Sequence, residues 1–495
     1  MMNNTVLIIG IIILSQMVHS QNKRANNWVT GYSGNRVDFN GATILTSQGL
    51  SPLKYFTGGN SCISDTSGNL VLASNGFHVL NNQGGFIDNG DTLVPSYYFT
   101  VQSGSSFLSQ TSIFLPMDSN KYYFVTPTFS DIRYDDCYNN NGNCYFDLLL
   151  YNVIDMNANG GAGKVTERMK PLMQNANLRK TQLMACRHGN GKDWWLLKNE
   201  GDYGDVHTFL FTQDSVYDKG VQTFAQPNWG EWDLRGQSAF NSDGSMFAST
   251  SDGSGSFASL GLVFLAEFDR CHGLLSNSSV LDMPWGSQHN PNNTTLLDKQ
   301  SVGVAFSPNN KFLYVISYAN VYQYDLLDKT WFHVAGLDTV ANKAQGYETA
   351  YMGPDNKIYI GNFGGTSKQM SRIDNPDVKG AGCNFCPRCL RLDSLGANAY
   401  VGTPPCMPNY GLGAKTSWPL SSEDLRIKDY ELVVYPNPSH SKFYIQNSTS
   451  KKKELYNSIG QLIFSTNENE IDVKHLSKGM YYLRCEGMSK KVIIE

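Results

Sequence analysis

Short runs of apolar and β-branched residues, separated by turn-forming residues, recur along most of the chain. The clearest unit, residues 301–326, reads SVGVAFSPNNKFLYVISYANVYQYDL. Val302–Phe306 and Phe312–Ile316 are apolar runs on either side of the turn Ser307–Asn310. Val321–Leu326 alternates between two sides, which is typical of a strand with one drier face. The unit therefore predicts short strands joined in a meander.

Degenerate copies of this unit precede and follow it at a spacing of about 50–60 residues, which suits four-stranded blades with long connections. A lone meander cannot bury its faces and has to stack on copies of itself. The sequence therefore predicts an all-β fold with a β-propeller of six to eight blades, seven favoured, over residues 21–415. The recognisable parts of the copies are Asp65–Gly68, Tyr122–Thr126 with Phe146–Ile154, Arg187–Gly191, Asn241–Gly244 and Gly353–Asn356.

The C-terminal residues have the pattern of a second, smaller β domain. After a polar stretch, expected to be a linker over residues 416–430, short alternating runs begin at Val433 and end at Ile494. Turn residues separate them at Pro436–Pro438, Ser458–Gly460 and Ser477–Gly479. This pattern predicts a small immunoglobulin-like β-sandwich over residues 431–495.

The N-terminal residues have the pattern of a secretory signal peptide over residues 1–20. The apolar run Val6–Leu14 is too short to span a membrane, and Val18–Ser20 precedes the expected cleavage between Ser20 and Gln21. The segment before the apolar run has no Lys or Arg, which leaves an uncleaved anchor as the alternative. With no other apolar stretch of that kind, we expect an exported mature chain without a transmembrane segment.

Composition excludes one class of partner and favours one class of fold. The formal net charge is −4, and a nucleic-acid partner would need a concentrated basic face, so we expect no nucleic-acid binding. The 46 Gly, 27 Tyr and 25 Phe favour turn-rich β structure, and no window predicts a long helix. We therefore expect little helix.

The ten cysteines of an exported chain indicate disulfides first. Cys137 and Cys144 bracket a turn-rich loop and are expected to pair across it. The cluster near the end of the repeats is a second set of disulfide candidates. Its C-x-x-C-x-x-C spacing leaves a zinc or iron–sulfur site as the sharper alternative. The members of that cluster are Cys383, Cys386, Cys389 and Cys406.

The order of motifs from residue 28 to residue 413 resembles the propeller-like region of secreted proteins that use the type IX secretion system, including gliding-motility-associated surface proteins. The resemblance rests on NWVTGYSGNRVDFN from Asn27, then FSPNNKFLYV, GPDNKIYIG and RIDNPDVKGAGCNF, and finally MPNYGLG. Met407 stands where such proteins usually have leucine, and the Cys-rich stretch near Cys386 is an extra insert.

The C-terminal domain resembles the type A sorting domain of the same system. By resemblance, it implies recognition by the type IX secretion machinery, passage through the periplasm, and location in the medium or on the outer cell surface after its own removal. The signature is YPNP, the N-x-x-G-Q turn and the L-x-x-G-x-YYL strand. Its residues are Tyr435, Pro436, Asn437, Pro438, Asn457, Gly460, Gln461, Gly479 and Tyr481.

Candidate chemistry is sparse, and we predict no catalytic set and no cofactor. His188, beside a Gly-Asn-Gly turn, could act as a base, but a structural hydrogen bond is the expected role. The cluster Asp131–Asp136 could hold structural calcium, although its spacing does not match a calcium loop, so we expect a solvated loop. An aromatic surface for a sugar could form around Trp229, Trp232, Arg235 and Trp285, although blade packing would use the same tryptophans.

Three functions fit these observations. The first is an exported surface protein whose propeller binds a glycan or protein partner. The second is a secreted hydrolase or lyase acting on polysaccharide or a small lactone, with acids from several blades meeting in the channel. The third is a scaffold or motility component without a small ligand. Carboxylates converging at a channel mouth would favour the enzyme, and amide or apolar side chains there would disfavour it.

Overall fold

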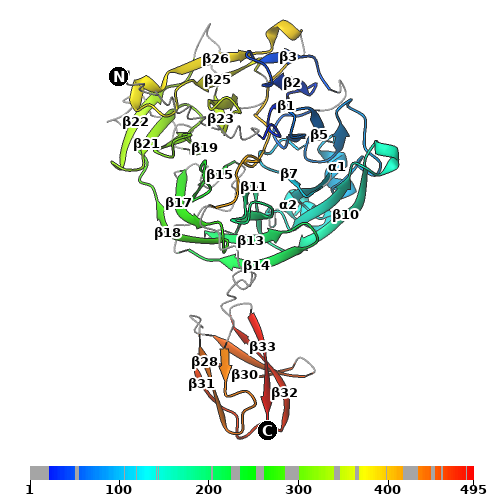
Figure 1. The fold of residues 1–495 in the computed structure, drawn as a ribbon, viewed down its shortest axis with the longest axis vertical. Helices are drawn as coiled ribbons and strands as arrows, with labels where there is room; N and C mark the ends of the chain where they lie inside the picture. Colours follow the sequence, from blue (N-terminus) through cyan, green and yellow to red (C-terminus); the bar gives the residue numbers. More distant parts are fainter. Residues whose placement is uncertain are drawn as a thin grey trace, which may run out of the picture. The chain divides into compact units, whose positions relative to one another are not determined.

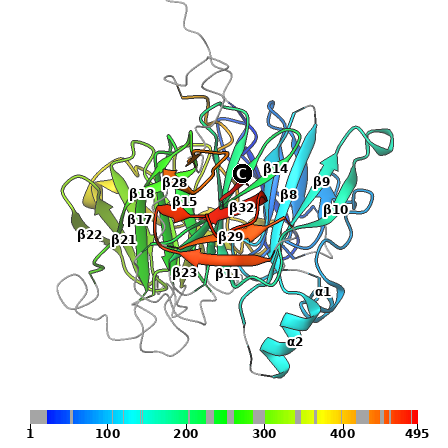
Figure 2. The same cartoon turned by 90° about the horizontal axis from the view of Figure 1, so that it is seen from below.

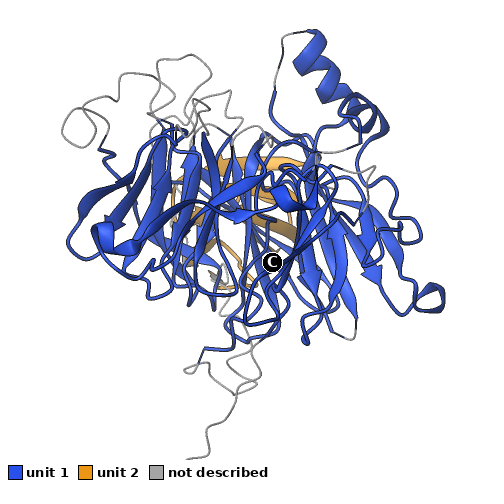
Figure 3. Cartoon of the chain, turned by 90° about the horizontal axis from the view of Figure 1, so that it is seen from above, with its two compact units in different colours: residues 1–415 blue, residues 416–495 orange. Residues whose placement is uncertain are grey.

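The computed structural model forms two compact units, residues 1–415 and 416–495, which are coloured separately in Figure 3. It describes residues 22–415 and 433–495, except for 51–54, 105, 119, 141, 143, 202–203, 225–234, 252–260, 285–299, 339–345, 363–366, 397–398, 447–451, 459–460 and 486–487. The predicted signal peptide, with Ser20 and Gln21, lies outside these residues. Among the described residues, no helix combines the length and apolarity that a membrane crossing requires.

The described part of the first unit contains seven antiparallel sheets, each built from strands that are consecutive in the chain. Figure 1 shows these sheets arranged radially around one centre, which confirms the predicted propeller and the favoured number of blades. The strands, blade by blade, are β1 (Asn27–Thr30), β2 (Asn35–Asp38), β3 (Leu45–Ser47); β4 (Ser61–Ser64), β5 (Leu70–Ser74), β6 (Val79–Asn81); β7 (Ile113–Pro116), β8 (Lys121–Thr128), β9 (Leu148–Asp155), β10 (Lys164–Met173); β11 (Leu178–Arg187), β12 (Trp194–Glu200), β13 (Asp205–Phe211), β14 (Val216–Gln222); β15 (Ser238–Phe240), β16 (Met246–Ser251), β17 (Leu262–Asp269), β18 (Leu274–Val280); β19 (Gly303–Phe306), β20 (Phe312–Ile316), β21 (Val321–Asp325), β22 (Thr330–Ala335); and β23 (Tyr347–Met352), β24 (Ile358–Asn362), β25 (Gln369–Ile373), β26 (Phe385–Arg391).

The turns between the first two strands of a blade explain why the repeat is visible in the sequence. Gly68 and Gly244 have φ angles of 96° and 71°, a region that glycine enters without steric cost. Asn310 and Asn356 take the equivalent turn positions with φ angles of 60° and 61°. Asparagine tolerates this left-handed region better than other residues with a side chain. Turns that end in glycine and turns that end in asparagine therefore place a residue with positive φ at the same position in different blades.

Each blade packs on its neighbours through both of its faces. Val304, Phe306 and Val315 of the sixth blade share one buried cluster with Val263 and Leu265 of the fifth. The strand β21 is consequently buried along its whole length, Val321–Asp325. The expectation of one drier face on this strand is wrong, because its polar side chains are covered by the seventh blade as well.

The inner strands β4, β7, β11, β15, β19 and β23 run in one direction, so the ring has two distinct faces. The Ser61 and Ser112 hydroxyls, at the starts of β4 and β7, lie 2.7 Å apart. We call the face at these starts the loop face. The opposite face, with the turns that join first to second strands, is the turn face.

The ring is closed by residues 399–415, which we call the closing segment. β1 runs against the direction of β4, because the Asn60 side chain before β4 donates to Val29 O near the end of β1. The closing segment lies along β1, where the Thr30 hydroxyl donates to the carbonyl oxygens of Val401 and Thr403. It then passes the centre of the ring, where it is the gold segment of Figure 1.

Two short α-helices and three 3₁₀ turns complete the described part of the first unit. The helices α1 (Ser96–Val101) and α2 (Asp131–Asn139) contact each other and extend beyond the ends of the strands, as Figure 2 shows. The 3₁₀ turns are η1 (Asn159–Gly161), η5 (Gly380–Cys383) and η6 (Asp393–Leu395).

The second unit is a β-sandwich, as predicted. One sheet has the order β27-β28-β31 and the other the order β30-β29-β32-β33. The core between them contains the fully buried Phe443, Leu455, Val473, Leu483 and Val492. The strands are β27 (Val433–Tyr435), β28 (Lys442–Gln446), β29 (Lys453–Asn457), β30 (Leu462–Thr466), β31 (Glu470–Asp472), β32 (Gly479–Cys485) and β33 (Met488–Ile494).

Candidate functional site

Buried glutamines join the inner strands across the ring. Gln237 accepts hydrogen bonds from the backbone N–H groups of Val304 and Ala350, at 3.1 and 2.9 Å, and donates to Ala350 O at 2.6 Å. Gln110 makes two bonds of 2.8 Å with the backbone of Ser238, one as donor and one as acceptor. These amides satisfy backbone groups of blades that no strand ladder connects, so they hold the ring centre together.

Apolar side chains fill the remaining space at the centre. Cys406 and Tyr410 of the closing segment share a buried cluster with Phe114, Leu183 and Tyr351 from three different blades. The Tyr410 hydroxyl donates to Phe114 O at 3.0 Å. The described residues therefore fill the centre, where a ligand or a catalytic group of an open propeller would lie.

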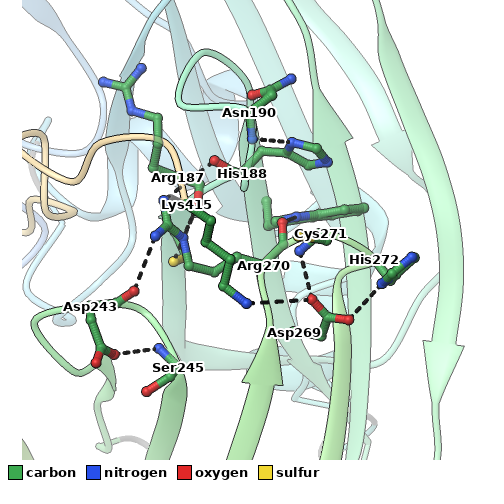
Figure 4. Close-up of polar contacts among 12 residues, drawn as sticks. Arg187, His188, Asn190, Asp243, Ser245, Asp269, Arg270, Cys271, His272 and Lys415 are labelled. Atoms are coloured by element: carbon green, nitrogen blue, oxygen red, sulfur yellow. Dashed lines mark hydrogen bonds and ion pairs between the residues drawn. The ribbon is translucent and has the colours of Figure 1, made fainter. Parts of the chain in front are cut away.

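One arginine fixes the end of the closing segment on the turn face (Figure 4). Arg270 is 3% exposed, and its guanidinium donates to four backbone carbonyls. Two of these belong to Arg187 and His188, at 2.8 and 3.4 Å. The others belong to Asp243, at 3.2 Å, and to Gly413, at 2.5 Å. Arg270 thus ties the turns of the fourth and fifth blades to the closing segment.

A second arginine holds the same segment from the fourth blade. Arg187 donates to Tyr410 O at 3.4 Å, and its guanidinium carbon lies 4.0 Å from the centre of the Trp194 ring. Burial lowers the pKa of Arg187 to about 10, so it remains charged at neutral pH. His188, next in the chain, accepts from Asn190 N, which is the structural bond expected for it. The contacts of Arg187 and Arg270 in Figure 4 thus connect the fourth and fifth blades with the closing segment, which is a structural role.

The predicted aromatic surface falls largely outside the described residues. Trp229, Trp232 and Trp285 are not described, and Arg235 lies just before β15 on the loop face. The positive charge of Arg235 acts on one carboxyl group, that of Glu348 in β23. Burial raises the pKa of Glu348 to about 7, and the positive charge of Arg235 lowers it only in part.

The cluster around Asp131 is a helix, so the expectation of a solvated loop is wrong. Ser130 caps α2, because its hydroxyl accepts from Arg133 N at 3.1 Å. The Asp131 carboxylate accepts from Tyr97 N and links the two helices. Among the described residues, no group of three or more His, Cys, Asp or Glu side chains is placed to hold a metal ion.

The two helices, which we call the helical insert, present apolar side chains on the loop face. Ile132 is 84% exposed and Tyr138 is 52% exposed. Tyr138 stacks on Tyr134 with ring centres 4.5 Å apart, and Lys180 lies over its ring. The insert is also stapled by the disulfide from Cys137 of α2 to Cys144. Its exposed aromatic surface is therefore held in one arrangement.

The remaining cysteine candidates do not form one cluster. Cys386 and Cys389 of β26 lie at disulfide distance from each other. Cys383 and Cys406 are buried as free thiols, and they belong to different core clusters. Cys383 packs between the sixth and seventh blades, whereas Cys406 lies at the ring centre, so the four do not share a metal site.

A histidine between two carboxylates stabilises the outer strands of the fourth blade. His207 Nε2 lies 2.7 Å from Asp218 Oδ1, and Nδ1 lies 3.2 Å from Glu200 Oε2. Burial lowers the pKa of His207, but the two acidic partners outweigh it and raise the pKa to about 9. This stabilisation is therefore complete below the ordinary histidine pKa near 6.5 and is lost as the pH rises towards 9.

We expect His207→Gln to cost about 1 kcal/mol of unfolding free energy at pH 6 and much less at pH 9.5, since Asp218 is partly solvated. Denaturant unfolding of wild type and variant at both pH values measures the difference. His272→Gln, at a histidine whose side chain is half exposed, is the control. An equal cost of His207→Gln at both pH values would contradict the assignment.

In the second unit, the YPNP turn is bound to the last strand. The Asn437 side chain donates to Lys491 O and accepts from Ile493 N, both at 2.8 Å. Asn437 therefore completes the hydrogen bonding of a strand that the sandwich would otherwise leave exposed at its edge. The flanking Tyr435 is 44% exposed.

The other signature residues also stabilise turns. The Asn457 side chain accepts from Gln461 N at 2.9 Å and donates to Gln461 Oε1 at 3.0 Å, which closes the N-x-x-G-Q turn. Gly460 lies outside the described residues. Tyr481 is 8% exposed, and its hydroxyl donates to Ser477 O at 2.9 Å, across the turn that contains Gly479.

We expect Asn437→Ala to destabilise the second unit by about 1–3 kcal/mol, because it leaves two backbone groups of β33 without partners. Export of the full chain should fall, with precursor accumulating in the periplasm, as measured by immunoblots of the medium and cell fractions. Asn467→Ala, at an exposed position of the same unit, is the matched control. If the Asn437→Ala chain is destabilised but exported normally, the hydrogen bonds of this turn are not required for export.

Comparisons with known proteins identify the family of the second unit. For the first unit they give only structures that are similar at low sequence identity. Residues 433–495 match the family model of the secretion system C-terminal sorting domain. No curated protein matches the chain. Three solved structures are similar at low identity. AztD from Citrobacter koseri has 10% identity, a TM-score of 0.33, and covers 78% of this chain and 86% of its own.

The second structure is a putative 6-phosphogluconolactonase from Bacteroides fragilis, with 12% identity, a TM-score of 0.33, and 74% and 86% coverage of this chain and its own. The third is an auxiliary nutrient binding protein from Bacteroides thetaiotaomicron, with 11% identity, a TM-score of 0.34, and 62% and 67% coverage. The sorting domain and its geometry carry the identification. The chain is a type IX secretion cargo, a propeller followed by a secretion system C-terminal sorting domain, and it is destined for the cell surface or the medium.

Proposed function

We propose that the exported propeller is a binding protein for a glycan or protein partner, and that it makes contact through its loop face. The filled ring centre is the observation that carries the proposal. Gln110 and Gln237 are hydrogen-bonded to blades that are not their direct neighbours, and Cys406 and Tyr410 lie in the core at the ring centre. A partner then has to be bound on the outside of the ring, where area and shape are available to a macromolecule.

The helical insert is the surface that we assign to this contact. Exposed aromatic and apolar side chains on a rigid support bind at low cost in conformational entropy. Ile132 and Tyr138 meet this description, since α2 is capped at Ser130 and stapled at Cys137. In keeping with export, we further propose that residues 1–20 and the sorting domain are removed before the propeller acts.

The test compares two equally exposed apolar side chains on opposite faces. Ile132→Asp changes the insert at a side chain that is 84% exposed, and Leu327→Asp changes the turn face at one that is 87% exposed. Wild type and variants are applied to a glycan array and to cells of the producing bacterium. We expect binding that Ile132→Asp reduces at least tenfold and Leu327→Asp leaves unchanged. Equal effects of both variants, or no binding by wild type, would overturn the proposal.

A secreted hydrolase is the second candidate, and Glu348 is the observation that favours it. A carboxyl whose pKa is raised to about 7 can act as a general acid at neutral pH, and Arg235 lies near enough to influence it. If the chain is an enzyme, Glu348→Gln should abolish hydrolysis of a polysaccharide or lactone panel without weakening adhesion. We expect no hydrolysis by wild type in this assay.

A further inference from the structure

A polar pocket of about 190 Å³ lies on the turn face between the first and second blades. One wall is made by Asn27 at the start of β1 and by Arg36 and Asp38 of β2. Asn69, in the turn between β4 and β5, and Asn82, after β6, make the other wall. The pocket is thus remote from the helical insert, which lies on the opposite face.

The floor of the pocket is fixed by a buried amide. Asn27 is 1% exposed, and its side chain donates to Gly68 O at 2.5 Å and to the Ser64 hydroxyl at 3.4 Å. Its carbonyl oxygen accepts from one amino group of Arg36 at 3.1 Å. The guanidinium of Arg36 is therefore held in a set direction before any ligand arrives.

The walls of the pocket offer both hydrogen-bond donors and hydrogen-bond acceptors to a ligand. Among the described residues, the Arg36 guanidinium donates to Asn27 alone, which leaves its other N–H groups available to a ligand. Asp38 accepts two bonds from Asn40 on Oδ1, whereas Oδ2 has no hydrogen-bond partner among the described residues. Arg36 and Asp38 do not form an ion pair in the described structure, although both border the pocket. Asn82 is exposed at the rim.

This mixture of groups selects a class of ligand. A phosphate or sulfate would be repelled by the Asp38 carboxylate, and a cation by the Arg36 guanidinium. A hydroxyl group donates and accepts at once, so neighbouring hydroxyls on one ring match a carboxylate beside a guanidinium. The volume is below the 300 Å³ or more of pockets for drug-sized ligands, so about one ring fits.

We propose that this pocket binds one neutral sugar unit through two neighbouring hydroxyls, with Asp38 Oδ2 accepting from one and Arg36 donating to the other. Asn82 would contact the same unit at the rim. The proposal deepens the proposed function by naming the ligand as a glycan, and it rests on that function only for its biological role. It adds a second contact, on the face opposite the helical insert.

The full chain is tested by saturation-transfer NMR with the methyl glycosides of glucose, galactose, mannose and N-acetylglucosamine. We expect at least one of these sugars to bind, and Arg36→Gln and Asp38→Asn each to weaken its binding at least tenfold. Asn82→Ala, at an exposed position on the rim, should weaken it about threefold. Asp88→Asn, at an exposed carboxylate of the second blade, is the control and should change nothing.

Absence of binding by all four sugars, or binding that survives all three pocket variants, would overturn the proposal. The same variants on the glycan array and on cells separate it from the proposed function. Glycan or cell binding that Ile132→Asp weakens and the pocket variants do not would leave the function standing and remove the pocket. Sugar binding in the pocket without any binding to cells or array would support the pocket and overturn the function.

Discussion

Arg270→Met is expected to destabilise the propeller by about 2–3 kcal/mol, because it removes four charge-assisted hydrogen bonds to backbone carbonyl oxygens, of which His188 O keeps a second donor in Gly191 N. A methionine can fill much of the space, so the loss is mainly one of hydrogen bonds. The midpoint of urea unfolding, followed by tryptophan fluorescence, measures the effect. Trp195 is a suitable reporter, since its indole donates to Arg270 O at 2.8 Å.

The matched control is Arg391→Met. Arg391 is largely exposed and pairs with Asp393 on the surface of the seventh blade, so its loss should cost less than about 1 kcal/mol. A similar cost for both variants would show that Arg270 contributes only as a surface ion pair does. Susceptibility to protease near Lys415 gives a second readout, because Arg270 binds Gly413 O and the freed segment should be cut faster.

The blades could be predicted from the sequence because their information is local. Turns such as Asp65–Gly68 and Ser307–Asn310 dictate backbone conformation through residues that are adjacent in the chain. The strands that these turns join are β-branched and aromatic, and β20 has the predicted limits Phe312–Ile316. The sandwich could be predicted in part for the same reason, since Asn457 bonds to Gln461 within its own turn, whereas the contact of Asn437 with β33 is distant in the chain and could not be predicted.

The closing of the ring could not be predicted, because it depends on contacts between the two ends of the first unit. Val401–Tyr410 contains prolines, has no alternation, and is held by the side chains of Thr30 and Asn60 rather than by a strand ladder. The role of Arg270 could not be predicted for a related reason, since the four acceptors of its guanidinium are backbone carbonyl oxygens of three distant segments. Ser130 and Asp131 have the residue types that typically begin a helix, but α2 is too short to show a helical period of apolar residues in the sequence.

Ending the chain after Leu395 is expected to prevent the propeller from folding, whereas ending it after Lys415 should leave the propeller as stable as in the full chain. The first truncation removes three side chains that are at most 2% exposed: Val401, which packs between the first and seventh blades, and Cys406 and Tyr410 at the ring centre. Burial of each contributes on the order of 1.5–3 kcal/mol, and the sum is comparable to the whole stability of a domain. Circular dichroism and urea unfolding of the two truncated chains make the comparison.

A point variant keeps this prediction testable if the shorter chain aggregates. Tyr410→Ala, in the chain that ends after Lys415, should cost about 3–5 kcal/mol, because it removes a buried ring and the bond to Phe114 O. Tyr400→Ala, at a partly buried tyrosine of the same segment, should cost clearly less. If the chain ending after Leu395 unfolds cooperatively at the same urea concentration as the longer one, the closing segment does not hold the ring together. The inner strands and their glutamines would then suffice.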